Sequence, residues 1–73
     1  MKKKLFTDRA LALREGKAVL KRNRTNEDAF LLRFRSKTDG SNLYILVYSH
    51  TGADKLEANP PRGLEYANDL VLG

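Results

Sequence analysis

Two dense apolar stretches near the middle of the chain predict its strongest secondary structure. "AFLLRFR" at 29–35 and "NLYILVYS" at 42–49 are rich in aromatic and aliphatic residues, which favour β-strands. Turn-forming residues separate them, including Asp39 and Gly40. The pattern therefore predicts a β-hairpin.

The length of the hairpin loop decides which side chains share a face. A three-residue loop at 38–40, with Gly40 in the left-handed position, pairs Lys37 with Ser41. One face is then wholly apolar and aromatic and is predicted to be the core face of the hairpin, with Phe30, Leu32, Phe34, Tyr44, Leu46 and Tyr48. The other face mixes cations with aliphatics, namely Leu31, Arg33, Arg35, Leu43, Ile45 and Val47. With a two-residue loop, Arg33 and Arg35 share a face with Tyr44 and Tyr48 instead.

The N-terminal segment carries signals for a helix followed by a strand. "TDRALALREG" at 7–16 predicts a helix with Thr7 as N-cap and Gly16 as the left-handed stop. Phe6, Ala10 and Leu13 would line its inner face. "KAVLKR" at 17–22 reads as a strand, and weak alternation around Gly16 leaves a hairpin open as the alternative.

The C-terminal part lacks strong periodicity. Residues 50–63 resemble a linker, and Asn59-Pro60-Pro61 should end whatever precedes them. "RGLEYANDLVLG" at 62–73 predicts a short helix or irregular segment. The mixed hairpin face would then be covered by this segment, by a second copy of the chain or by an outside partner.

These segments together predict a small single α+β domain over residues 1–73. It has an N-terminal helix, a three-stranded antiparallel β-meander and a short C-terminal helix or irregular segment. A chain of 73 residues without cysteine fits one small core in a reducing compartment, and we expect a cytoplasmic protein that does not enter the membrane.

Charge is divided unevenly along the chain, whose formal net charge is +5. Residues 1–37 contain twelve Lys/Arg and four Asp/Glu, whereas residues 38–73 contain two and five. A basic half of this kind raises the local concentration of anionic partners such as nucleic acid.

Signals for catalysis are sparse. His50 is the single histidine, and no glycine-rich phosphate loop or metal-ligand spacing occurs in the sequence. Ser49 and His50 would point to opposite faces of a strand, so they cannot act as a dyad. We therefore expect a non-enzymatic protein with no metal and no cofactor.

The basic residues favour two functional hypotheses. The first is a non-catalytic interaction module, which binds or inhibits a nucleic-acid-associated protein through the mixed sheet face, as some phage and mobile-element inhibitors do. The alternative is direct, non-specific binding to nucleic-acid phosphates, with tyrosines stacking on bases. A homodimer is a further option. The candidate binding residues are Arg33 and Arg35, with Lys21, Arg22, Arg24, Tyr44 and Tyr48 in support.

"AFLLRFRS" at 29–36 resembles the Phe-Leu-Val-Arg segment of Src-homology-2 domains, which bind phosphotyrosine. A helix before it and a strand after it follow that family's order. The resemblance implies that Arg33 would contact the phosphate, with Ser36 and Arg9 nearby. It covers about twenty residues, and the family's opening tryptophan and later pocket histidine have no counterpart here.

Overall fold

The described part of the chain folds as a four-stranded sheet with two helices. The computed structural model describes residues 2–22 and 29–72. In chain order the elements are β1 (Lys3–Phe6), α1 (Arg9–Arg22), β2 (Phe30–Ser36), β3 (Asn42–Val47), α2 (His50–Ala58) and β4 (Leu64–Leu70). The predicted α+β class is confirmed, but the predicted meander lacked β1 and β4 and the layout lacked α2.

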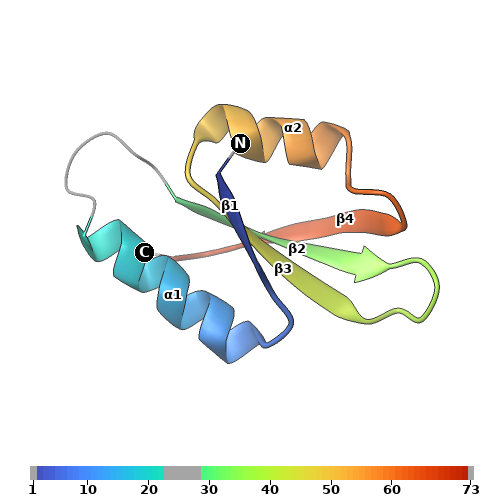
Figure 1. The fold of residues 1–73 in the computed structure, drawn as a ribbon, viewed down its shortest axis with the longest axis horizontal. Helices are drawn as coiled ribbons and strands as arrows, with labels where there is room; N and C mark the ends of the chain where they lie inside the picture. Colours follow the sequence, from blue (N-terminus) through green and yellow to red (C-terminus); the bar gives the residue numbers. More distant parts are fainter. Residues whose placement is uncertain (1, 23–28, 73) are drawn as a thin grey trace.

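The two helices lie on opposite faces of the sheet (Figure 1). The strand order is β1-β3-β2-β4, and each neighbouring pair is antiparallel. α1 connects β1 to β2 across β3, and α2 connects β3 to β4 across β2. Both connections move two positions along the sheet towards β4, but they start from β1 and β3, which are antiparallel. Two crossovers of the same hand that start from antiparallel strands must lie on opposite faces of the sheet.

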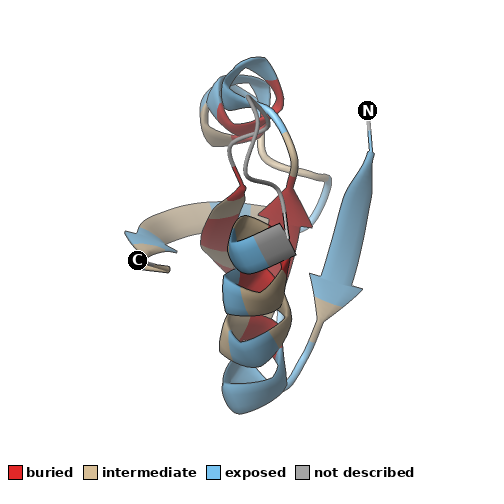
Figure 2. Cartoon of the chain, turned by 90° about the vertical axis from the view of Figure 1, so that its left-hand side faces the viewer, coloured by how far each residue is buried: buried red, intermediate tan, exposed pale blue. Residues whose placement is uncertain are grey.

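Each face of the sheet has its own apolar cluster. On the α1 side, Ala12 and Val19 pack with Leu31, Tyr44 and Leu46. On the α2 side, the cluster contains Leu32, Phe34, Ile45, Val47, Ala53 and Leu56. Figure 2 shows burial concentrated in the central strands and the inner sides of the helices, whereas β1 is mostly exposed. β2 and β3 are therefore covered on both faces, which explains their nearly continuous apolar sequence.

The prediction that α1 stops at Gly16 was wrong, because residues 17–22 continue the helix rather than form a strand. Gly16 is buried, and a Cβ atom placed on it would lie 2.6 Å from Cδ2 of Leu72. This glycine therefore allows close approach of the C-terminal residues. The rival hairpin reading is also excluded.

The start of α1 also differs from the prediction. The Asp8 carboxylate accepts a hydrogen bond from the backbone N–H of Ala10 at 3.0 Å, so Asp8 and not Thr7 is the N-cap. The predicted inner face is correct only in part, because Leu13 packs against the core on this side of the sheet. Ala10 is exposed, and Phe6, which packs against the same core, belongs to β1 and not to the helix.

The hairpin loop contains four residues, 37–40, one more than predicted. Ser36 and Ser41 close it, because the Ser36 N–H donates to the Ser41 carbonyl at 2.8 Å. Within the turn, the Gly40 N–H donates to the Ser36 carbonyl at 2.9 Å. Arg33 therefore pairs with Tyr44, and neither predicted register is correct. The division of faces nevertheless matches the second alternative, with both arginines on the side of Tyr44 and Tyr48.

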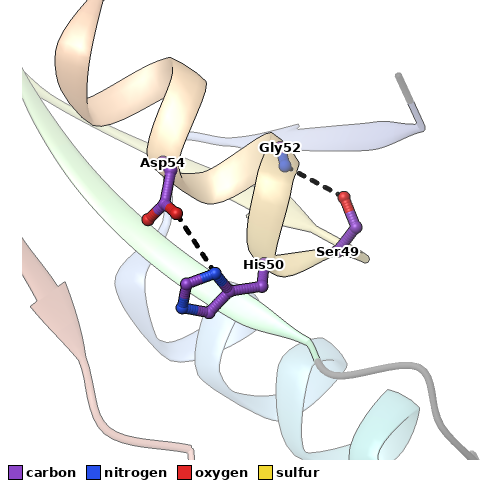
Figure 3. Close-up of polar contacts among 4 residues, drawn as sticks. All are labelled: Ser49, His50, Gly52 and Asp54. Carbon is purple, nitrogen blue, oxygen red and sulfur yellow. Dashed lines mark hydrogen bonds and ion pairs between the residues drawn. The ribbon is translucent and has the colours of Figure 1, made fainter.

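The segment expected to be a linker forms α2. Ser49 caps it, since its hydroxyl accepts from the Gly52 N–H at 3.0 Å (Figure 3). Asn59 is its C-cap, as the predicted stop at Asn59-Pro60-Pro61 requires. The last segment, predicted to be helical or irregular, is β4. It pairs with β2 and contains an irregularity opposite Arg33 and Phe34.

Candidate nucleic-acid interface

Three basic residues form a row on the solvent side of α1. Arg14, Lys17 and Lys21 are exposed and lie three and four residues apart, which places them on one face of the helix. The opposite face of α1 packs on the sheet through Ala12 and Val19. We call Arg14, Lys17 and Lys21 the α1 stripe, and Figure 2 shows the exposed outer side of the helix that carries it.

The α1 stripe exists because the helix continues through Gly16. A strand at 17–22 would have separated Arg14 from Lys17 and Lys21. Glu15 is the only acidic residue of α1, and it is half-buried beside the stripe. Among the side chains that the structure describes, the one contact within 4.0 Å between a basic and an acidic group joins His50 Nδ1 and Asp54 Oδ2 of α2 at 3.1 Å (Figure 3). The positive charge of the stripe is thus not neutralised by these neighbours.

A polar area lies on the same side of the sheet, towards the β2–β3 turn. Arg33 is half-buried on β2, and its Nε donates to Asn68 Oδ1 of β4 at 2.6 Å. Its Nη1 donates to Asn42 Oδ1 of β3 at 3.2 Å. Arg35 is exposed between Asn42 and Glu65, its partners on the two neighbouring strands. The polar area thus consists of Arg33, Arg35, Asn42, Glu65 and Asn68.

The tyrosines proposed to stack on bases have other neighbours. Tyr44 is only 5% exposed and packs in the core beneath α1. Tyr48 is half-buried, and the Lys2 ammonium lies 5.4 Å from the centroid of its ring. The Tyr44 ring is therefore not accessible for stacking on a base, and the Tyr48 ring already contacts the Lys2 ammonium.

Acidic side chains gather on the other face of the sheet. On β4, the Tyr66 hydroxyl donates to Asp69 Oδ1 at 2.5 Å. A hydrogen bond with Asp69 raises the pKa of the Glu57 carboxyl above its ordinary value. Burial, followed by the contacts with these two carboxylates, raises the pKa of Tyr66. The α2 side of the sheet thus carries this pair of carboxylates, whereas Arg33 and Arg35 lie on the α1 side.

The predicted mixed face of arginines and aliphatics does not form. Ile45 and Val47 are fully buried on the α2 side, whereas Arg33 and Arg35 lie on the α1 side. α2 supplies the cover that was assigned to the C-terminal segment, a second copy or a partner. The mixed face does not form because the loop is one residue longer than predicted, and a shift of one residue in the register changes which side chains of the two strands share a face.

The remaining candidates are scattered. Lys21 is part of the α1 stripe, whereas Arg24 and the side chain of Arg22 lie outside the described residues. Ser36 lies on the opposite face of β2 from Arg33 and hydrogen-bonds Thr38, whereas the Src-homology-2 resemblance implied that Ser36 would lie near the phosphate held by Arg33. The grouping of Arg14 and Lys17 with Lys21 was missed, although their helical spacing was present in the sequence.

None of the described residues forms a group of three or more metal-ligating side chains. In the same part of the chain, no helix is long and apolar enough to cross a membrane. Comparison with known proteins found no matching family model, no matching curated protein and no matching solved structure.

Proposed function

We propose that this protein binds nucleic acid by contacting the phosphate backbone with the α1 stripe. The observation that carries the proposal is the row of exposed cations Arg14, Lys17 and Lys21, which has no carboxylate partner within 4.0 Å among the described side chains. Such cations displace the counterions condensed on nucleic acid, which favours binding without reading the base sequence.

Double-stranded nucleic acid is the form that this surface suits best. Proteins that hold single strands usually add aromatic side chains on which bases stack. Tyr44 is buried here and Tyr48 is paired with Lys2. A row of cations on one face of a helix instead suits the regular phosphate spacing of a duplex. From Arg14 to Lys21 the row spans about 10 Å along the helix axis.

The test measures the affinity of fluorescently labelled duplexes and single strands by polarisation between 50 and 200 mM salt. Three phosphate contacts correspond to a slope of about −2.7 in a plot of log affinity against log salt concentration, or about a 40-fold loss over this range. The stripe variant carries Arg14→Gln, Lys17→Gln and Lys21→Gln, and we expect it to lose most of this salt dependence together with its affinity.

A matched control loses the same charge elsewhere. Lys3, Lys55 and Arg62 are exposed, and none belongs to α1. Their combined replacement with glutamine should weaken binding much less than the stripe variant does. Equal weakening by both variants would show that net charge and not the stripe matters. If the unaltered protein fails to bind duplex at 50 mM salt, the proposal is overturned, and a protein partner becomes the target to seek.

A further inference from the structure

Arg33 is an unusual residue for a central strand. Its neighbours on the same face of β2 and β3 include the buried residues Leu31 and Tyr44. An aliphatic side chain at this position would extend the core, yet the half-buried residue is a cation. Side chains that carry charge in such places are normally paired with an opposite charge.

The partners of Arg33 hold it in place but leave its charge intact. Both are amide oxygens, Asn68 Oδ1 at 2.6 Å and Asn42 Oδ1 at 3.2 Å. No carboxylate that the structure describes lies within 4.0 Å of the guanidinium, although Glu65 is on the adjacent strand. A guanidinium has five N–H donors, and these two bonds leave three for an outside acceptor.

We propose that Arg33 is a second phosphate-binding point, separate from the α1 stripe and on the same side of the sheet. This inference rests on the proposed function and extends the path of the nucleic acid from α1 towards the β2–β3 turn. Asn42 and Asn68 are positioning residues, because they fix the planar guanidinium before the phosphate arrives. A fixed guanidinium can present two parallel N–H groups to the oxygens of one phosphate.

Arg35 extends the same point along β2. It is exposed and lies two residues beyond Arg33, which places the two side chains on one face about 6.6 Å apart along the strand. Because Arg35 has no hydrogen-bond partner among the described side chains, we assign it the weaker contact. Arg33 is accordingly the residue to test.

The main experiment compares three single variants that each lower the net charge by one. Arg33→Gln removes the guanidinium, and Asn42→Asp keeps the oxygen beside Nη1 but adds a carboxylate that neutralises it. Lys55→Gln is the control, because Lys55 is exposed on α2 at the opposite face. Circular dichroism checks that all three variants fold. Duplex affinity is then measured from 50 to 200 mM salt.

Loss of one phosphate contact should reduce the salt slope by about 0.9. The affinity ratio between the unaltered protein and either Arg33→Gln or Asn42→Asp should then shrink about 3.5-fold from 50 to 200 mM salt. Lys55→Gln should keep the original slope. If the unaltered protein binds duplex and Arg33→Gln keeps its full slope, the inference is overturned while the proposed function stands.

A second measurement separates backbone phosphate from free phosphate. The Nε–H signal of Arg33 is identified by nuclear magnetic resonance as the one missing in Arg33→Gln, and it is followed during titration with duplex and with inorganic phosphate. A shift with duplex supports the inference, and a shift with inorganic phosphate alone reassigns the point to small phosphates and overturns it. An unchanged signal in both titrations also overturns it. Failure of the unaltered protein to bind duplex defeats the proposed function instead.

Discussion

Replacing Gly16 with alanine tests whether α1 continues through this position and packs against the C-terminal residues. A Cβ atom at residue 16 would lie 2.6 Å from Cδ2 and 3.1 Å from Cδ1 of Leu72. Carbon atoms pack best at about 3.5 Å or more, so the tip of Leu72 would have to move by about 0.9 Å. Alanine is also a better helix former than glycine by about 0.8–1.0 kcal/mol.

These two effects oppose each other, and a double-mutant cycle separates them. With Leu72 replaced by alanine, Gly16→Ala should raise the free energy of unfolding by about 0.8–1.0 kcal/mol through helix propensity alone. With Leu72 present, displacement of this half-buried side chain should remove most or all of that gain. We therefore expect a coupling energy of about 1 kcal/mol between the two positions.

Urea denaturation followed by circular dichroism at 222 nm measures all four proteins of the cycle. If Gly16 were instead a left-handed helix stop, alanine would destabilise the protein whether or not Leu72 were present. Equal destabilisation in both backgrounds would therefore refute the continuous helix and, with it, the α1 stripe. If Gly16→Ala stabilised the protein equally with and without Leu72, only the close packing between residue 16 and Leu72 would be refuted.

Three further results follow from the core, the helix cap and the turn. Ile45→Asp places an unpaired charge in the core beneath α2, so we expect the variant to be unfolded. A variant with a native circular dichroism spectrum that had lost only its binding would contradict this. Asp8→Ala removes the cap of α1 and should cost about 1 kcal/mol in urea denaturation, whereas an unchanged midpoint would exclude Asp8 as the cap. The pKa of Asp39 is held below its ordinary value of 3.8 by hydrogen bonds from Ser41, of which the one from the backbone N–H has the largest effect. The ionised Asp39 carboxylate therefore stabilises the fold above pH 3.8, and this contribution is lost as the pH falls through the lowered pKa. Ser41→Ala removes the hydroxyl donor, so carbon-13 titration of Asp39 should show its pKa rising towards 3.8, and an unchanged value would contradict the assignment.

The central strands were readable from sequence because their composition leaves few alternatives. Phe30–Ser36 and Asn42–Val47 are dense in side chains that favour strands, and both were assigned correctly. The basic character of the N-terminal half was equally plain. Local composition is enough for these features because each depends on residues that are close together in the chain.

The ends of α1 and the identity of α2 were harder to read. Gly16 resembles a helix stop in sequence, and only Leu72, at the far end of the chain, explains why glycine is needed inside the helix. α2 buries only Gly52, Ala53 and Leu56, so its apolar pattern is too weak to separate it from a linker. These elements depend on packing partners that are distant in sequence.

The candidate site shows the same division between sequence and tertiary structure. The sequence by itself determined that Arg33 and Arg35 share one face of β2, since alternate residues of a strand point the same way. Which face that is, and what lies on it, depended on a four-residue turn and on pairing with β4 from the end of the chain. Tertiary structure alone placed Asn42 and Asn68 beside Arg33, because three strands must meet before those amides can reach one guanidinium.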